Sequence, residues 1–325
     1  MSVTIHDVAR RANVSISTVS RAFTSPDLVR HQTRSRVLAA ASELGYHAAG
    51  APQPVARIGH IGIVVSDLGN PFFTGVLDGV QARARQDDVA VLFASSDQDP
   101  ATEQNLVRRM ARQVDGVVLG SPSMTDDQLR ALAGQTTLVL LNREVPGIPS
   151  IVMDAADGMR QAIEHLAALG HRRCAYLGGP RMSWANRARR QGLTEAAERH
   201  GTEVVEFGPF PPVFEGGLQG ADLALAADVT AIVAYNDLVA FGALARLNAR
   251  GVPVPDEISL VGFDDLVFAA ISAPPLTTIA MPTEAAGRAA VTILLDLLEG
   301  DADEHTTQVL DTYLIVRATT APPAS

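Results

Sequence analysis

A run of hydroxyl side chains ending in an arginine lies near the N-terminus and comprises Ser15, Ser17, Thr18, Ser20 and Arg21. Hydroxyl groups suit the phosphate oxygens of a nucleic-acid backbone. An arginine guanidinium can bind a guanine edge through two hydrogen bonds, which contribute about 1–3 kcal/mol of base discrimination. Ile16 lies in the same run and can offer only an apolar contact, for example to a thymine methyl group. If one helix presents these side chains together, they predict a DNA-reading surface.

Two short helices joined by a tight turn are predicted between residues 4 and 23. Thr4 is a good N-cap for the first helix, and Asp7 can complete a capping box with it. Asn13 tolerates the left-handed backbone that a sharp turn requires. Val19 and Ala22 can face the first helix, which leaves the polar run on an outer surface. The second helix of such a helix-turn-helix fits the DNA major groove.

A third helix is predicted from about residue 31 to residue 44, with Gly45 at its stop position. Apolar residues recur at helical spacing along it, and its buried stripe is expected to consist of Val37, Leu38, Ala41 and Leu44. The three helices together predict a small all-α head.

The charge distribution separates this basic N-terminal part from an acidic remainder. Residues 1–57 carry seven arginines against three acidic residues, a net charge of +4. The whole chain carries −10, so the remainder carries −14. A basic head on an acidic body is the electrostatic footprint of a DNA-binding domain fused to another domain.

The same stretch resembles the DNA-binding head of the LacI/GalR (lactose repressor) family. The matching pieces are Thr4-Ile5-x-Asp7-Val8-Ala9, Val14-Ser15, Thr18-Val19-Ser20-Arg21, Thr33-Arg34 and Leu44-Gly45-Tyr46. The resemblance implies that Ile16, Ser17 and Arg21 read the bases. Contacts to the DNA backbone are expected from the hydroxyls and the guanidinium of Thr4, Ser15, Thr18, Ser20, Thr33 and Arg34. Arg10 and Arg11 are expected to face solvent.

The segment after Tyr46 departs from the family pattern. Family members usually have Pro-Asn two residues after the tyrosine and then a short helix with Ala-x-x-Leu, whose leucine enters the minor groove. Here Ala48-Ala49 replaces Pro-Asn, Pro52 replaces the alanine and Val55 replaces the leucine. Because prolines are poor inside a helix, we expect no usual hinge helix, and Val55 is either an apolar wedge or part of an extended linker. The predicted domains are 1–47 for DNA binding, 48–57 for the linker and 58–325 for effector binding and dimerisation.

From residue 58 onward, short apolar runs alternate with helical patterns. Strands are predicted in two series, at 61–65, 89–94, 116–120 and 137–141, then at 174–179, 204–207, 231–235 and 258–263. This alternation predicts an α/β body with parallel sheets in two lobes. We expect the first lobe at about 58–154 and 284–312, and the second at about 155–283 and 313–325.

Ligands of such sheets bind beyond the carboxyl ends of the strands. The body resembles the effector-binding part of the same family, which is similar to periplasmic sugar-binding proteins, in His165 to His171, in Pro275 to Ile279 and at the strand ends. The resemblance implies a carbohydrate effector held by Ser66, Phe73, Asn142, Trp184, Arg189, Phe210, Asn236, Asp264 and Met281.

The chemistry of these residues suits a polar ligand. Arg189, with Asp264 expected beside it across the cleft, can bind vicinal hydroxyls or a carboxylate; the alternative is a structural ion pair between the two. Asn236 can donate and accept. Aromatic stacking is assigned to Phe73 rather than Phe72, and Phe214 competes with Phe210 for the second aromatic position.

Other chemistries have little support in the sequence. Gly178-Gly179-Pro180 lacks the lysine and hydroxyl of a P-loop, and no G-x-G-x-x-G opens a helix. The eight histidines show no metal-ligand spacing, and Cys174 lies inside an apolar run. We therefore expect no metal, no cofactor and no enzymatic activity. An enzyme acting on sugars would need a nucleophile or an acid pair that we cannot place.

Neither a transmembrane run nor a signal peptide is expected, because no apolar run reaches membrane length and the chain begins with a capped helix. These features predict a cytoplasmic homodimer that binds a pseudo-palindromic double-stranded DNA operator. The predicted function is a transcriptional regulator, a repressor whose DNA binding a sugar modulates. The alternative is a sugar-binding module without a DNA function, which would leave the basic head unexplained.

Overall fold

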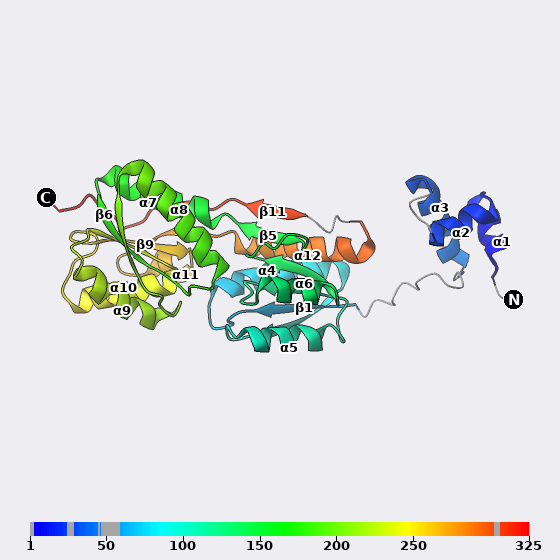
Figure 1. Cartoon of the computed structure of the whole chain (residues 1–325), viewed down its shortest axis with the longest axis horizontal. Helices are drawn as coiled ribbons and strands as arrows, with labels where there is room; N and C mark the ends of the chain where they lie inside the picture. Colours follow the sequence, from blue (N-terminus) through cyan, green and yellow to red (C-terminus); the bar gives the residue numbers. More distant parts are fainter. Residues whose placement is uncertain (1–2, 25–28, 45, 47–58, 302–305, 325) are drawn as a thin grey trace. The chain divides into compact units, whose positions relative to one another are not determined.

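The computed structural model describes residues 3–24, 29–44, 46, 59–301 and 306–324 (Figure 1). The chain divides into two compact units, residues 1–57 and residues 58–325, which we call the head and the body. The expectations about a hinge helix and about Val55 lie outside the described residues.

Three helices make up the head, namely α1 (Ile5–Ala12), α2 (Ile16–Thr24) and α3 (His31–Leu44). The Asp7 carboxylate accepts hydrogen bonds from the Thr4 backbone N–H (3.0 Å) and the Thr4 hydroxyl (2.6 Å), so α1 begins with the expected capping interaction. Asn13 has a φ of 51° and ends α1 in the left-handed region. Small and β-branched side chains from all three helices form the core, which consists of Val8, Ala9, Ala12, Val19, Ala22, Val37, Ala40 and Ala41.

One expectation for α3 is wrong. Leu38 is 38% exposed rather than buried, whereas Ala40 lies in the core. The α3 side chains that contact the other helices are therefore smaller than the sequence pattern predicts, which fits a head built from three short helices.

The first lobe of the body contains a six-stranded sheet in the order β11-β5-β4-β3-β1-β2, with every pair parallel. Its strands are β1 (His60–Val65), β2 (Ala90–Ser95), β3 (Gly116–Gly120), β4 (Thr137–Leu141), β5 (Ser150–Met153) and β11 (Thr307–Leu310). Its helices are α4 (Phe72–Ala84), the short η2 (Arg85–Asp87), α5 (Pro100–Met110), α6 (Asp126–Ala133) and α12 (Thr283–Glu299). Alternate strand residues point to opposite faces, so α4 and α12 cover one face and α5 and α6 the other.

The second lobe repeats this plan in the order β12-β10-β9-β8-β6-β7. Its strands are β6 (Arg173–Leu177), β7 (Glu203–Phe207), β8 (Ala231–Ala234), β9 (Ser259–Asp264), β10 (Thr277–Ala280) and β12 (Tyr313–Ile315). Its helices are α7 (Ala155–Leu169), α8 (Trp184–His200), α9 (Phe214–Leu225), α10 (Asp237–Ala249) and the short α11 (Val267–Ile271). Helices α7 and α8 pack on one face and α9 and α10 on the other (Figure 1). The predicted two-lobed α/β fold is confirmed, although β12 pairs antiparallel with β10.

The chain crosses between the two lobes three times, after β5, after β10 and after β11. The first and third crossovers are tied together, because the Asp154 N–H donates to the Leu310 carbonyl (2.9 Å) and the Thr312 hydroxyl donates to the Asp154 carbonyl (2.8 Å). One buried apolar cluster runs through both lobes at this place. The crossovers therefore form a compact hinge region.

Helices α9 and α10 approach closely because glycines meet backbone carbonyls at their crossing. A Cβ atom on Gly217 would lie 1.9 Å from the Val239 carbonyl oxygen, and one on Gly242 would lie 1.9 Å from the Phe214 carbonyl oxygen. No other residue type fits at either position without moving the helices apart.

Candidate functional site

The predicted base-reading residues lie together on the outer surface of α2. Ile16 is 42% exposed, and Ser17 and Arg21 are exposed beside it. Val19 and Ala22 are buried on the opposite side of the same helix. The helix therefore presents an apolar group, a hydroxyl and a guanidinium to the outside.

The hydroxyls predicted to contact phosphate are partly engaged within the head. The Ser15 hydroxyl accepts from the Thr18 N–H (3.1 Å) and lies 2.8 Å from the hydroxyls of both Ser17 and Thr18. Ser15 is therefore the cap of α2, and the hydroxyl of Thr4 is engaged by the Asp7 carboxylate at the start of α1. Ser20 and Arg34 are exposed, and Thr33 is half-buried. DNA contacts by these residues stay predictions.

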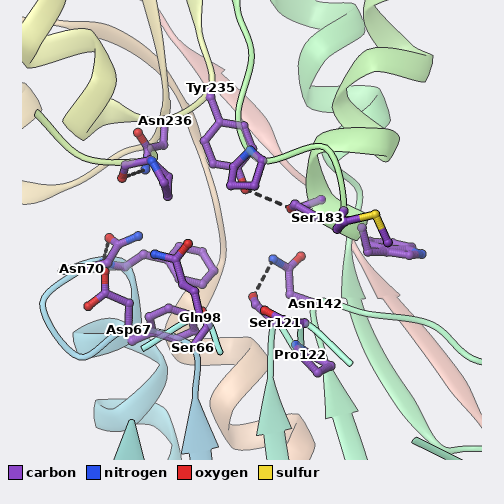
Figure 2. A pocket seen from close by; sticks show the side chains of 18 of the residues that line it. Ser66, Asp67, Asn70, Gln98, Ser121, Pro122, Asn142, Ser183, Tyr235 and Asn236 are labelled. Atoms are coloured by element: carbon purple, nitrogen blue, oxygen red, sulfur yellow. Dashed lines mark hydrogen bonds between the residues drawn. The ribbon is translucent and has the colours of Figure 1, made fainter. Parts of the chain in front are cut away.

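A cavity of about 440 Å³ lies between the two lobes of the body (Figure 2). Figure 2 shows Tyr235 and Asn236 of the second lobe facing Asn70, Gln98 and Asn142 of the first. The carboxyl ends of β1, β2, β3 and β4 all contribute to the first-lobe side, as the sheet topology requires.

The structure brings seven of the nine predicted ligand-binding residues to this cavity, namely Ser66, Phe73, Asn142, Trp184, Arg189, Asn236 and Asp264. Phe72 lines it as well, so the expected choice between Phe72 and Phe73 is unnecessary; the two rings pack edge to face with centroids 5.1 Å apart. That these residues contact an effector stays a prediction.

The other two residues lie elsewhere. Phe210 is buried in the apolar core of the second lobe, and Met281 is buried in the cluster at the crossovers. Neither lines the cavity, because both side chains are taken up by packing. Phe214, the competing aromatic, is 40% exposed at the start of α9 and does not line it either.

Four cavity residues have left-handed backbone conformations without being glycine. The φ angles are 61° at Gln98, 49° at Ser121, 57° at Asn142 and 122° at Asp264. Each residue lies at or just after the carboxyl end of a strand. Such strain persists where the surroundings impose it, and it concentrates at functional sites.

Arg189 and Asp264 form a buried pair inside the cavity wall. The Arg189 guanidinium donates to the Asp264 carboxylate (3.2 Å) and to the Tyr235 carbonyl (2.8 Å). It also lies over two rings, 4.4 Å from the centroid of Tyr235 and 4.0 Å from that of Phe263. Both residues belong to the second lobe, so the expectation that they face each other across the cleft is wrong. Burial raises the pKa of Asp264, and the nearby Arg189 opposes that rise.

Two buried polar atoms of cavity residues have no hydrogen-bond partner within the described part of the chain. Asn142 donates from its amide nitrogen to the Ser121 hydroxyl (3.1 Å), but its amide oxygen accepts nothing. The Nε atom of Arg189 is also unpaired. Unpaired buried groups are costly, and both of these atoms belong to residues that line the cavity.

Several cavity residues escaped the sequence analysis, among them Asp67, Asn70, Gln98, Ser121, Ser183 and Tyr235. Each of these residues follows the end of a strand by one to six positions, and that position was the available signal. Asn236 is less free than expected, because its amide oxygen accepts from the Val239 N–H (2.9 Å) and its nitrogen donates to the Pro212 carbonyl (3.1 Å).

Among the described residues, no group of three or more histidine, cysteine or acidic side chains could hold a metal ion. Burial raises the pKa of the Cys174 thiol to about 12, which keeps it in the unreactive thiol form. The described helices include none that is long and apolar enough to cross a membrane.

Two family models and several known proteins match this chain. Residues 4–49 match the family described as bacterial regulatory proteins, lacI family, and residues 163–320 match the periplasmic binding protein-like domain. The HTH-type transcriptional repressor CytR of Escherichia coli K12 is 32% identical over 98% of this chain and 96% of its own length. The chain belongs to the LacI family. It is a helix-turn-helix transcriptional regulator rather than an enzyme.

Other LacI-family proteins match over the same length. The HTH-type transcriptional regulator GalS of Salmonella typhimurium is 32% identical over 98% of this chain and 97% of its own length. A solved complex of the regulator CelR with cellobiose is 33% identical, with a TM-score of 0.74 over 98% of this chain and 99% of that one. A lac repressor dimer bound to operator is 29% identical, with a TM-score of 0.75 over 99% of this chain and 100% of that one. A sugar-binding module without a DNA function is excluded, because the match includes the head.

Proposed function

We propose that this LacI-family regulator represses transcription by binding an operator through α2 and that a sugar in the interlobe cavity releases it. In the head, Arg21 binds a guanine edge, Ile16 contacts an apolar base edge, and Ser17 hydrogen-bonds a neighbouring base. Thr33 and Arg34 bind the DNA backbone. Because the partner is chromosomal DNA, we place the protein in the cytoplasm.

The effector is proposed to bind between the lobes and to close them about the three crossovers. A ligand shifts such an equilibrium only if it binds one state more tightly. A ligand that contacts Asn142 of the first lobe and Arg189 of the second can do so, because both contacts form together only when the lobes are close. The relative solved with cellobiose supports a carbohydrate as the ligand class.

We also propose a homodimer whose second copy packs against α11. This five-residue helix exposes three large apolar side chains, with exposed fractions of 71% at Val267, 49% at Phe268 and 72% at Ile271. Exposed apolar patches of this kind mark interaction sites. The relative described as a dimer on its operator supports a second copy as the occupant.

One observation carries the proposal. A cavity with unpaired buried polar groups lies between the two lobes of a chain whose head matches a DNA-binding family. A gel-shift experiment with fragments of the source genome tests it. The full-length protein is expected to retard a small set of fragments, and a binding sugar is expected to release them. Retardation of no fragment at low salt would contradict the proposal.

A further inference from the structure

We propose that the effector is an uncharged polyhydroxylated molecule and that the cavity rejects phosphorylated or carboxylated sugars. This inference rests on the proposed effector role of the cavity. It is carried by four features of the cavity, namely the charges of its lining, the direction of the neighbouring arginines, the helix ends around it and its one unpaired acceptor.

The charged side chains that line the cavity are two carboxylates and one guanidinium, from Asp67, Asp264 and Arg189. The guanidinium is already engaged by the Asp264 carboxylate and the Tyr235 carbonyl, and two aromatic rings cover it. An anion would therefore meet a lining that carries two carboxyl groups against one guanidinium, and both terminal nitrogens of that guanidinium already donate to protein acceptors. Like charges brought together in a binding site repel each other.

Further arginines occur close to cavity residues in the sequence, and Arg143, Arg181, Arg187 and Arg190 do not line the cavity. Arg143 follows Asn142, yet its guanidinium donates to the Asp126 carboxylate (2.6 Å). Arg187 lies on the first turn of α8, yet its guanidinium donates to the Met182 carbonyl (3.2 Å). Neither lines the cavity, and the chain contains no lysine that could replace them.

Five helices begin at the cavity, and free N–H groups at helix N-termini usually bind anions. Here a side chain already accepts a hydrogen bond from one of these N–H groups at each helix. The pairs are Asn70 with the Phe72 N–H of α4 (3.0 Å), Asp99 with the Thr102 N–H of α5 (2.7 Å), Thr125 with the Gln128 N–H of α6 (3.4 Å), Ser183 with the Asn186 N–H of α8 (3.2 Å) and Asn236 with the Val239 N–H of α10 (2.9 Å). The hydrogen bonds from Thr102 lower the pKa of Asp99, so α5 begins beside an ionised carboxylate.

The remaining lining suits hydroxyl groups. The unpaired amide oxygen of Asn142 can accept a hydrogen bond, which sugar hydroxyls are able to donate. Ser66, Gln98 and Ser121 add neutral groups that both donate and accept. The hydroxyl groups of a sugar can thus form hydrogen bonds with the cavity lining without bringing a net charge into the cavity.

Paired ligands test this inference on the full-length protein. Isothermal titration compares glucose with glucose 6-phosphate, ribose with ribose 5-phosphate and cellobiose with cellobionate. We expect at least one neutral member to bind and its anionic counterpart to bind at least about tenfold more weakly. Tighter binding of an anionic member would overturn the inference while leaving the sugar-responsive regulator intact. If neither member of any pair bound while DNA was still retarded, the carbohydrate assignment would fail and the inference with it.

A charge variant makes the test sharper. Asp67→Asn keeps an oxygen that can accept from the Gly69 N–H, as the carboxylate does now at 2.7 Å. It removes one negative charge from the lining, so the difference in affinity between neutral and anionic sugars is expected to narrow. Asp256→Asn makes the same charge change on an exposed loop outside the cavity and is expected to leave that difference unchanged. Equal behaviour of the two variants would count against the inference.

Discussion

Arg189 of α8 and Asp264 at the end of β9 lie 3.2 Å apart, and both side chains are about 4% exposed. The pair lies within one lobe, so it exists whether the cavity is open or closed. A buried ion pair is strongly destabilising to break from one side, because it leaves an uncompensated charge. The pair therefore holds the guanidinium in place at the cavity wall without a ligand.

Asp264→Asn is expected to weaken effector binding by roughly 10- to 100-fold, because it leaves Arg189 without its counter-charge at a cavity wall. Isothermal titration with a bound sugar measures this loss. The matched control is Asp265→Asn, which removes the neighbouring carboxylate that pairs with Arg317 at 2.7 Å outside the cavity. An equal loss in both variants would show that the ion pair has no specific part in binding.

Arg21→Ala is expected to lower the affinity for the specific operator by roughly 10- to 100-fold, because a bidentate guanine contact is worth about 1–3 kcal/mol. The affinity for unrelated DNA is expected to stay nearly unchanged. Gel shifts at fixed salt with operator and random duplexes measure both affinities. Arg10→Ala, on the exposed side of α1, removes the same charge and serves as the control. A uniform loss on every duplex would reassign Arg21 to a phosphate contact.

Much of the body could be predicted because its central strands are continuous apolar runs. The predicted segments 116–120 and 137–141 have the bounds of β3 and β4, whose residues are almost all buried. Four short strands, β5, β10, β11 and β12, were not predicted, and each has only three or four residues. The pairing of β11 and β12 depends on the third crossover, which periodicity does not reveal.

Some cavity residues were predicted because they end or directly follow a strand, although Ser121 and Tyr235, which directly follow β3 and β8, were not. Asn142 comes immediately after β4, and Asp264 ends β9. Phe210 and Met281 do not line the cavity, because an apolar side chain near a strand end can face either a core or a cavity and only the packing decides. Gln98 and Ser183 were missed because they lie in loops whose path depends on the tertiary fold.

Ile271→Asp is expected to convert the proposed dimer to a monomer at micromolar concentration, because it places a charge in the centre of the exposed apolar surface of α11. Sedimentation velocity measures the change, and operator retardation is expected to weaken with it. Leu223→Asp makes the same substitution on α9, at a side chain that is 46% exposed, and is expected to remain dimeric. A dimeric Ile271→Asp protein would place the interface elsewhere.

Glu103 of α5 is fully buried and holds the loop that carries Ser121 and Ser123 into the cavity. One oxygen of its carboxylate accepts from the N–H groups of Ser123 (2.9 Å) and Met124 (3.1 Å). Burial raises the pKa of Glu103 from about 4.5 to about 7; Arg143 opposes the rise and Asp99 adds to it. The folded protein therefore holds this proton more tightly than the unfolded chain does.

That difference makes stability depend on pH with a definite sign. Between about pH 4.5 and pH 7 the folded state binds more protons at Glu103, so its contribution to stability falls as the pH rises, and the loss is complete above pH 7. A pKa difference of this size between the folded and unfolded chains corresponds to a loss of about 3 kcal/mol in the free energy of unfolding. Glu103→Gln cannot titrate, so its thermal midpoint relative to that of the unmodified protein is expected to rise by several degrees from pH 5 to pH 8.

Thermal unfolding of the full-length proteins at pH 5, 6, 7 and 8 measures this difference. Glu257→Gln, at an exposed position before β9, is the control and is expected to show a constant difference across the range. Parallel curves for Glu103→Gln and the unmodified protein would contradict the prediction, because they would mean that Glu103 titrates alike in the folded and unfolded chains. A rising difference would instead identify the carboxylate as a buried group that is retained for the hydrogen bonds that shape the cavity loop.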